Sequence, residues 1–282
     1  MSRSYPPLRQ RDAESLARGY SRAFRAVEVL SILAFFGMLG CLVARVWTPA
    51  RSSPWLVVIA VVSGYLAADF CSGVVHWLGD TWGSPDVPVL GAAVIRPFRE
   101  HHVDQTAITR HDFVETNGAN CLISLPVSTA TLLLPVETGQ ELGLFGATFL
   151  GSLVLWVFAT NQFHKWAHLS TPPVWIALLQ RWHLILPPEH HAVHHAAPFS
   201  RYYCITVGWL NWPLFKIRFF PLLEELVTSL TGALPRRDDL GDRAARFVLQ
   251  EQQEDAVSAL SVAALTDATC CAPSANPRKT LG

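Results

Sequence analysis

Long apolar stretches separated by short polar segments dominate the first two thirds of the chain. Four of them are candidate membrane spans, because a helix needs about 20 apolar residues to cross the hydrocarbon. They cover residues 27–47, 54–75, 118–136 and 142–163. Two shorter apolar runs, residues 175–186 and 204–215, carry tryptophan, arginine and proline, which is typical of helices in the membrane interface. The pattern predicts an all-α polytopic membrane helical bundle of about four transmembrane helices plus interfacial helices.

Polar sequence flanks this apolar region on both sides. The segment before the first span contains six arginines, and the sequence after about residue 231 is polar, with one possible surface helix over residues 242–260. We therefore expect three parts, namely a basic N-terminal arm over residues 1–26, a membrane domain over 27–232 and a polar tail over 233–282.

The arginine distribution predicts the orientation of the bundle. Lysine and arginine concentrate on the cytoplasmic side of membrane proteins, so the basic arm predicts a cytoplasmic N-terminus. Four spans then place Arg45, Arg51 and the acidic turn over residues 137–141 outside. Both termini and every histidine fall on the cytoplasmic side. We expect an integral multi-pass protein, in the inner membrane if the chain is bacterial.

Composition agrees with a membrane protein. Half of the residues are hydrophobic and 16% are charged, against about 25% charged in soluble domains. The formal net charge of zero gives no reason to expect nucleic acid as a partner. The six cysteines include no CxxC pair and do not form a disulfide framework.

All eleven histidines lie between residues 76 and 195, in spacings that suit metal ligands. His164 and His168 form an HxxxH pair, and HxxHH is formed by His191, His194 and His195. Positions three or four apart share a helix face, and imidazole is the commonest metal ligand. Eight histidines are candidate ligands: His76, His101, His102, His164, His168, His191, His194 and His195. Eight exceed the needs of one ion, so the pattern predicts two metals at the cytoplasmic face.

Adjacent His101 and His102 can both be ligands only if the backbone turns or if they serve different metals. Asp80, four residues after His76, is expected to orient that histidine or to ligate directly. Asp69 lies two turns before His76 on the same helix face and is a candidate acceptor behind it.

Other histidines leave alternatives open. His190 points away from the HxxHH face and is a candidate for contact behind the ligands. His111 suits a ligand, a phosphate contact or a capped loop residue, and His183 suits packing at the interface. The competing interpretations are an aromatic-belt role for the HxxxH pair and adventitious metal affinity for the HxxHH segment.

Four cations accompany the histidines: Arg96, Arg99, Arg110 and Lys165. Guanidinium groups bind phosphate in a bidentate manner, so a phospholipid headgroup is a candidate partner. The alternative is the ordinary excess of positive charge on the cytoplasmic side.

The histidine boxes are similar to those of membrane desaturases and hydroxylases with a non-haem di-iron centre. Further motifs narrow the resemblance, namely DFCSGVVHW at 69–77, RPFREHHVDQTAITRHDFVETNG at 96–118, TNQFHKWAH at 160–168 and ITVGWLN at 205–211. With them, the chain from about residue 67 to 239 resembles the plasmanylethanolamine desaturase family, also called the Kua or CarF-like lipid desaturase domain family.

This resemblance implies an O2-dependent oxidoreductase with two iron ions. Its substrate would be an ether phospholipid, which loses two hydrogens next to the ether oxygen to give the vinyl ether of a plasmalogen. No flavin or nicotinamide motif is present, so electrons would come from a cytoplasmic cytochrome b5-like or ferredoxin-like protein. Bacterial members of the family also suggest a link to light-induced carotenoid synthesis.

Three alternatives remain at this stage. A fatty-acyl phospholipid desaturase or hydroxylase of the same superfamily would use the same ligands, and so would a metal-dependent membrane hydrolase. A non-enzymatic membrane signalling protein is the alternative of a different class.

Overall fold

A computed structural model describes residues 21–82, 95, 98, 101–102, 104–137, 139–196 and 199–235. These residues belong to one compact unit. Most of the basic arm and nearly all of the polar tail, including the expected helix over 242–260, lie outside the described residues.

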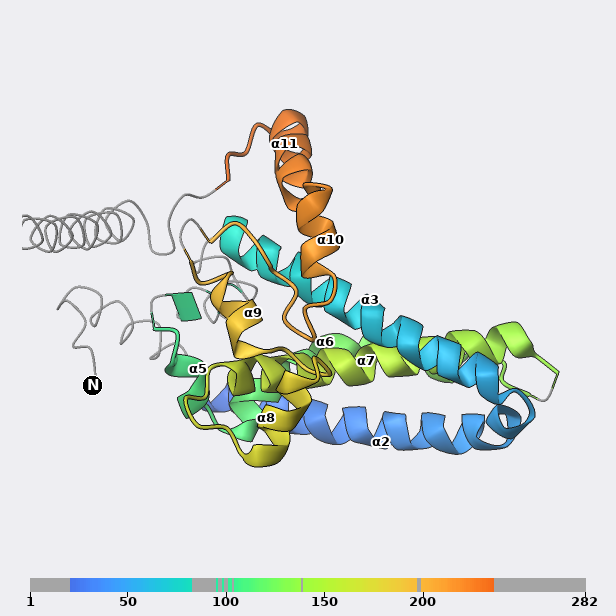
Figure 1. Ribbon diagram of the computed structural model, residues 1–282. Helices are drawn as coiled ribbons and strands as arrows, with labels where there is room; N and C mark the ends of the chain where they lie inside the picture. Colours follow the sequence, from blue (N-terminus) through green and yellow to red (C-terminus); the bar gives the residue numbers. More distant parts are fainter. Residues whose placement is uncertain are drawn as a thin grey trace, which may run out of the picture. The chain divides into compact units, whose positions relative to one another are not determined.

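The described elements are helical (Figure 1). Four of them are long: α2 (Arg22–Ser52), α3 (Pro54–Thr81), α6 (Phe113–Leu132) and α7 (Glu141–Ala167). The short ones are α5 (Ala107–Arg110), α8 (Val174–Arg181), α9 (Pro188–Ala192), α10 (Asn211–Lys216) and α11 (Phe219–Thr231). The all-α prediction is confirmed.

The long helices run beside one another, with α2 packed on α6, α3 on α7, and α6 on α7. The α2–α3 turn and the α6–α7 connection lie at the same end of the bundle (Figure 1). Arg45 joins them there, because its guanidinium donates to the carbonyls of Leu132 and Leu134. The C-terminal ends of α3 and α7, which carry histidines, therefore lie at the opposite end.

Three helices, α2, α3 and α7, are long and apolar enough to span a membrane among the residues that the structure describes. The fourth expected span is also a helix, α6, but it is not among the helices that are apolar enough to span a membrane. It starts at Phe113 because Asp112 caps it, accepting from the backbone N–H groups of Val114 and Glu115 at 3.0 Å each. That α6 crosses the membrane stays a prediction.

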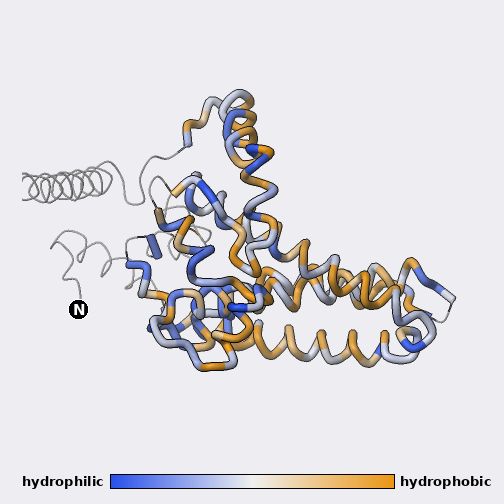
Figure 2. Tube along the Cα trace, viewed as in Figure 1, coloured by the Kyte–Doolittle hydropathy of each residue, from blue (hydrophilic) through white to orange (hydrophobic). Residues whose placement is uncertain are grey.

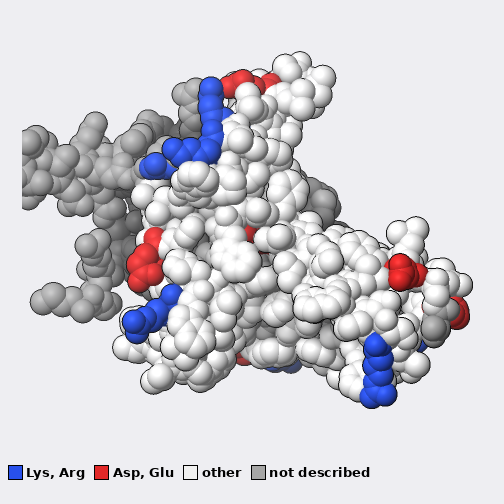
Figure 3. Space-filling model, turned by 45° about the vertical axis from the view of Figure 1, so that its right-hand side comes forward, with Lys and Arg blue, Asp and Glu red and all other residues white. Residues whose placement is uncertain are grey.

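Large hydrophobic side chains point outward from the long helices. Leu30 and Leu33 on α2 are both 66% exposed, and Trp55 on α3 is 78% exposed. Apolar residues follow α2, α3 and α7 along much of their length (Figure 2), and much of the middle of the molecule carries an uncharged surface (Figure 3). A helix that is hydrophobic all round is typical of a membrane span. This surface is the one that lipid tails would cover.

One short apolar run differs from its predicted form. The run over 175–186 contains α8 as expected, but in 204–215 only the second half is helical, as α10. Cys204, Ile205 and Val207 are buried in a non-helical segment against α3. The expected interfacial helix over 204–215 is therefore wrong in its first half, because side chains of α3 pair with its backbone.

Helices α3 and α7 approach closely at Gly64. A Cβ atom built there would lie 2.6 Å from the backbone oxygen of Phe149 and 2.6 Å from Cβ of Ser152. Ser152 also donates to the carbonyl of Val61 at 2.8 Å. Small residues at such contacts let membrane helices pack with their backbones close together.

Gly64→Ala should therefore lower the midpoint of thermal unfolding in detergent, because backbone atoms cannot move away and overpacking costs about 1–3 kcal/mol. Gly37→Ala on α2 is the matched control, since a Cβ there meets nothing within 4 Å. It should be neutral or slightly stabilising, as alanine favours helices by up to about 1 kcal/mol over glycine. Equal midpoints for the two variants would contradict the described α3–α7 contact.

Candidate metal centre

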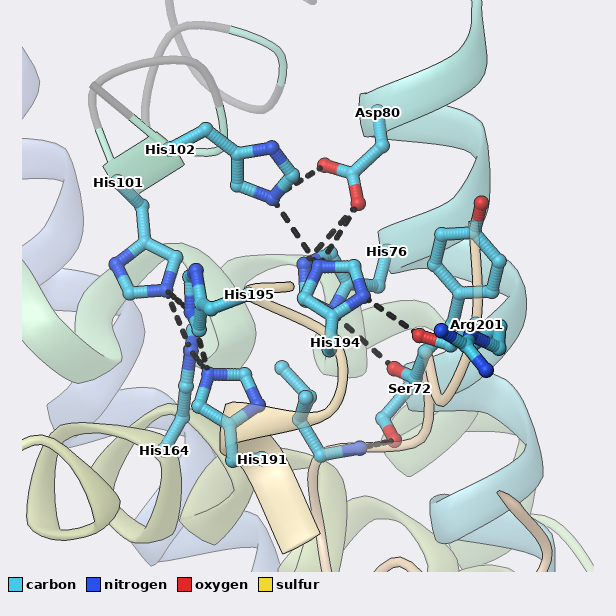
Figure 4. A network of polar contacts seen from close by, with 12 residues as sticks. Ser72, His76, Asp80, His101, His102, His164, His191, His194, His195 and Arg201 are labelled. Carbon is cyan, nitrogen blue, oxygen red and sulfur yellow. Dashed lines mark hydrogen bonds and ion pairs between the residues drawn. The ribbon is translucent and has the colours of Figure 1, made fainter. Parts of the chain in front are cut away.

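Nine side chains with metal-ligand chemistry form two groups at the histidine-bearing end of the bundle. Figure 4 labels all of them except His168. The first, which we call the five-histidine group, contains His101, His164, His168, His191 and His195. The second, which we call the Asp80 group, contains His76, Asp80, His102 and His194. Within each group the ligand atoms lie within 4.8 Å of one another. All eight histidines singled out in the sequence are in one group or the other.

Four parts of the chain supply these side chains. The last turns of α3 carry His76 and Asp80, and the end of α7 carries His164 with His168 just beyond. The HxxHH residues come from α9 and the turn after it. The remaining two, His101 and His102, precede α5. The site is therefore anchored to two long helices.

Adjacent histidines divide between the groups. His101 belongs to the five-histidine group and His102 to the Asp80 group, and His195 and His194 divide in the same way. Of the two arrangements open for adjacent ligands, the geometry matches the one in which they serve different metals. The groups lie side by side, since the ring centroids of His194 and His195 are 5.3 Å apart.

Backbone carbonyls fix the ring orientation in the Asp80 group. Nδ1 of His76 lies 3.1 Å from the carbonyl oxygen of Tyr203, and Nδ1 of His194 lies 2.9 Å from that of Arg201. A carbonyl only accepts, so in the neutral rings Nδ1 carries the proton and Nε2 presents its lone pair. These Nε2 atoms lie 3.3 and 3.4 Å from Oδ2 of Asp80. Lone pairs and a carboxylate that converge in this way suit a cation.

The five-histidine group converges in the same manner. Nε2 of His164 lies 3.0 Å from Nε2 of His101 and 2.8 Å from that of His191. Nε2 of His195 lies 2.9 Å from those of His101 and His191. Nε2 of His168 is buried and has no hydrogen-bond partner in the described part of the chain. Buried polar atoms are normally satisfied, so this donor set fits a metal ion.

Burial keeps these imidazoles neutral. Desolvation, with neighbouring imidazoles adding to it, lowers the pKa of His101 and His191 well below the usual value. It lowers the pKa of His168 to about 4. Metal ligation requires the neutral ring, so these residues are ready to ligate at neutral pH.

A segment that we call the return segment, residues 203–211, supports the site from behind. The buried carboxylate of Asp69 accepts from the backbone N–H groups of Val207, Gly208 and Leu210 at 2.8–3.1 Å. Asp69 was expected behind His76, but Tyr203 supplies the acceptor there. Asp69 instead holds the segment that begins with Tyr203.

Further polar groups hold the return segment to the bundle. Ser72 on α3 accepts from the backbone N–H of Ile205 at 3.0 Å, and the hydroxyls of Thr160 and Thr206 are 2.7 Å apart. The side chain of Asn211 pairs with both backbone groups of Cys204 at 2.8 Å. None of these residues was predicted to support the site, although polar residues within apolar runs were the available signal.

Three histidines lie outside both groups. Nε2 of His111 is 3.7 Å from Oε1 of Glu115, and His190 packs on Tyr202 with ring centroids 4.9 Å apart. His183 adopts a left-handed backbone conformation, and its carbonyl accepts from Trp209 at 2.8 Å. The structure brings none of the three within the sets of converging ligand atoms.

Two of the four candidate headgroup cations are described, and both have protein partners. Arg110 pairs with Asp104 at 2.5 Å, and Nζ of Lys165 donates to the carbonyl of His111. Arg96 and Arg99 lie outside the described residues.

Comparison with known proteins gives the same family as the sequence motifs. Residues 65–238 match the family model described as the lipid desaturase domain. The chain is 57% identical to the plasmanylethanolamine desaturase of Myxococcus xanthus over 242 residues, which is 86% of this chain and 85% of that protein.

It is 46% identical to plasmanylethanolamine desaturase 1 of Mus musculus over 234 residues, covering 81% of this chain and 86% of that protein. It is 34% identical to the chloroplastic fatty acid desaturase 4 of Arabidopsis thaliana over 181 residues, or 63% and 54% of the two chains. No solved structure matches the chain. The family match includes all nine members of the two groups.

His168→Ala tests the five-histidine group, because it removes a buried donor with no hydrogen-bond partner among the described residues. If each group holds one ion, we expect the metal content of the purified protein to fall by about half, because the five-histidine group loses a ligand. Elemental analysis measures this content. His183→Ala is the control and should retain the full content, as His183 lies outside both groups. Equal loss in the two variants would mean that the ligand set is drawn incorrectly.

Proposed function

Because this chain belongs to the lipid desaturase domain family, we propose that it is an O2-dependent plasmanylethanolamine desaturase with two iron ions. The reaction removes two hydrogens from the alkyl carbons next to the ether oxygen and leaves a vinyl ether. Those two hydrogens, with two electrons and two protons from outside, reduce O2 to two molecules of water. The observation that carries the proposal is the pair of adjacent ligand groups at the end of a bundle of apolar helices.

Iron is the metal that best fits both the ligands and the reaction. Imidazole nitrogen suits zinc, copper, iron and nickel, but zinc has no redox chemistry. Iron bound in the two groups would supply the oxidising power that cleavage of an unactivated C–H bond requires. The eight histidines add no charge, and the Asp80 group carries a single carboxylate.

The protein's own side chains hold the ligands and limit access. The carbonyls of Arg201 and Tyr203 keep two imidazoles in one tautomer, and such partners behind the ligands commonly affect metal affinity 10- to 100-fold. The ligand side chains His76 and His194 are fully buried, which keeps bulk water away from them. A lipid tail would reach the site from the surrounding bilayer, since the site lies where α3 and α7 end.

Electron supply and orientation belong to the same proposal. We place the site and both termini in the cytoplasm, where a cytochrome b5-like or ferredoxin-like protein would deliver electrons. Of the four cations expected to contact the headgroup, Arg110 and Lys165 already have protein partners, and contacts by Arg96 and Arg99 remain part of the proposal. The chloroplastic relative is named a fatty acid desaturase, so an acyl phospholipid is the second candidate substrate.

Lipid profiling of a host that contains plasmanylethanolamine but no vinyl ethers tests the reaction. Expression of the chain in air should produce acid-labile vinyl-ether lipids, and anaerobic expression should produce none. His164→Ala should insert into the membrane yet give no product, because a buried ligand is removed. A new double bond in acyl chains alone would instead identify the acyl desaturase.

Cysteine labelling tests the orientation. Gln105→Cys precedes α5 near the histidine-bearing end, and Gln140→Cys lies in the α6–α7 connection. A membrane-impermeant thiol reagent applied to intact cells should label the second variant and spare the first, relative to the unmodified chain. Labelling at residue 105 from outside would overturn the cytoplasmic site. Labelling of neither would mean that the α6–α7 connection is not outside.

A further inference from the structure

A cavity of about 440 Å³ lies between the segment after α9 and the helices α10 and α11. Two guanidinium side chains, Arg201 and Arg218, contribute to its lining. Leu214, Phe215 and Phe220 supply apolar surface. No acidic side chain is among its described lining residues. A cavity with cations on apolar walls suits an amphiphilic anion.

Both guanidinium groups are accessible for such an anion. Arg201 lies over the ring of Phe215, 5.9 Å from its centroid, and its side chain is exposed. Arg218 pairs with Glu225 at 3.5 Å, but both side chains are about two thirds exposed. Exposed ion pairs are weak, so a phosphate can replace the carboxylate. Arginine binds phosphate through two parallel N–H donors.

The backbone around the cavity is unusual. Tyr202 and Arg218 both line it, and both adopt left-handed conformations with φ of 60° and 55°. Such conformations are uncommon in residues other than glycine and cluster at functional sites. Two of the four left-handed non-glycine residues in the described part of the chain therefore belong to this one cavity.

One short stretch of chain contacts both the cavity and the metal ligands. The carbonyl of Arg201 accepts from His194, and the carbonyl of Tyr203 accepts from His76 (Figure 4). Between them, Tyr202 lines the cavity together with the Arg201 side chain. The residues that line the cavity are therefore continuous in the chain with those whose carbonyls orient two ligands of the Asp80 group.

The dimensions of the substrate also require the phosphate site to lie close to the metal centre. In an ether phospholipid the phosphorus and the first alkyl carbon are separated by about six single bonds, at most about 9 Å when fully extended. The headgroup phosphate must therefore bind next to the metal centre. Arg110 and Lys165, the described candidates from sequence, already pair with Asp104 and with a carbonyl.

We propose that this cavity, the Arg201–Arg218 pocket, binds the phosphate of the lipid substrate and so places the ether-linked carbons at the metal centre. The inference rests on the proposed function, in that the substrate is a glycerophospholipid. The apolar wall formed by Leu214, Phe215 and Phe220 packs against the glycerol and the first methylene groups.

The test compares two substrates in mixed micelles, plasmanylethanolamine and the matching 1-alkyl-2-acylglycerol, which lacks the phosphate. The unmodified protein should prefer the phospholipid. The double variant Arg201→Gln, Arg218→Gln should lower kcat/KM for the phospholipid roughly 10- to 100-fold through a higher KM, because charge-assisted hydrogen bonds are lost. Its kcat/KM for the alkylacylglycerol and its metal content should not change.

Lys216→Gln is the matched control, an exposed cation on α10 that does not line the pocket. It should leave the preference for the phospholipid intact. An equal loss with both substrates in the double variant, or the same loss in Lys216→Gln, would overturn the proposal. So would an unmodified protein that uses the two substrates equally well.

Lipid binding separates this proposal from the proposed function. Native mass spectrometry of detergent-solubilised protein should show phosphatidylethanolamine retained by the unmodified chain and lost from the double variant, whether or not either is active. If neither ether substrate is converted but this difference remains, the desaturase assignment fails and the pocket stands. Equal lipid retention by the two proteins, or retention of inorganic phosphate as tight as that of lipid, would overturn the pocket.

Discussion

Convergence of unshared electron pairs is the constraint on which this structure depends. One group contains five imidazole nitrogens, and the other contains three imidazole nitrogens and a carboxylate. Within each group these ligand atoms lie within 4.8 Å of one another. In the Asp80 group, Nδ1 of His76 and of His194 donates its proton to a backbone carbonyl. The Nε2 atom of each ring therefore carries an unshared electron pair. Such atoms repel one another in a buried site unless a cation lies between them. The bundle therefore brings together two sets of donor atoms, each of which could hold a metal ion.

The return segment holds the backbone that orients a ligand imidazole in a fixed position. The carboxylate of Asp69 lies two turns down α3 from His76 and orders the backbone from Val207 to Leu210. Asn211 and Ser72 fix the neighbouring residues Cys204 and Ile205. Gly73 makes room for them, because a Cβ there would lie 2.5 Å from Sγ of Cys204. The carbonyl of Tyr203, which orients His76, therefore belongs to a segment that is held by the same helix that carries His76.

Much of the site was predictable because its spacings are local. His164 and His168 lie on one turn at the end of a span, and a helix brings such residues together whatever the rest of the fold does. For adjacent His101 and His102 the sequence left two arrangements open, a turned backbone or different metals, and the structure places the two residues in different groups. Helix α6 was harder to place, since a cap at Asp112 rather than hydrophobicity sets where it begins.

The rest depends on tertiary contacts that no spacing records. The apolar run over 204–215 has the composition of an interfacial helix, yet hydrogen bonds to Asp69 and Ser72 of α3 hold its first half in a non-helical form. Likewise, Arg201 and Arg218 line one cavity although they are not neighbours in sequence, and Tyr202 and Gly208 between them adopt left-handed conformations. The partners of His76 and His194 are backbone carbonyls. Every residue has a backbone carbonyl, so the order of side chains in the sequence cannot predict which one is used.

An anomalous-difference map recorded at the iron absorption edge would test the central claim most directly. The account predicts two iron peaks in the protein. One would lie within about 2–2.3 Å of the histidine nitrogens of the five-histidine group, and the other at the same range from those of the Asp80 group. A single peak, or peaks that appear at the zinc edge and not at the iron edge, would contradict it.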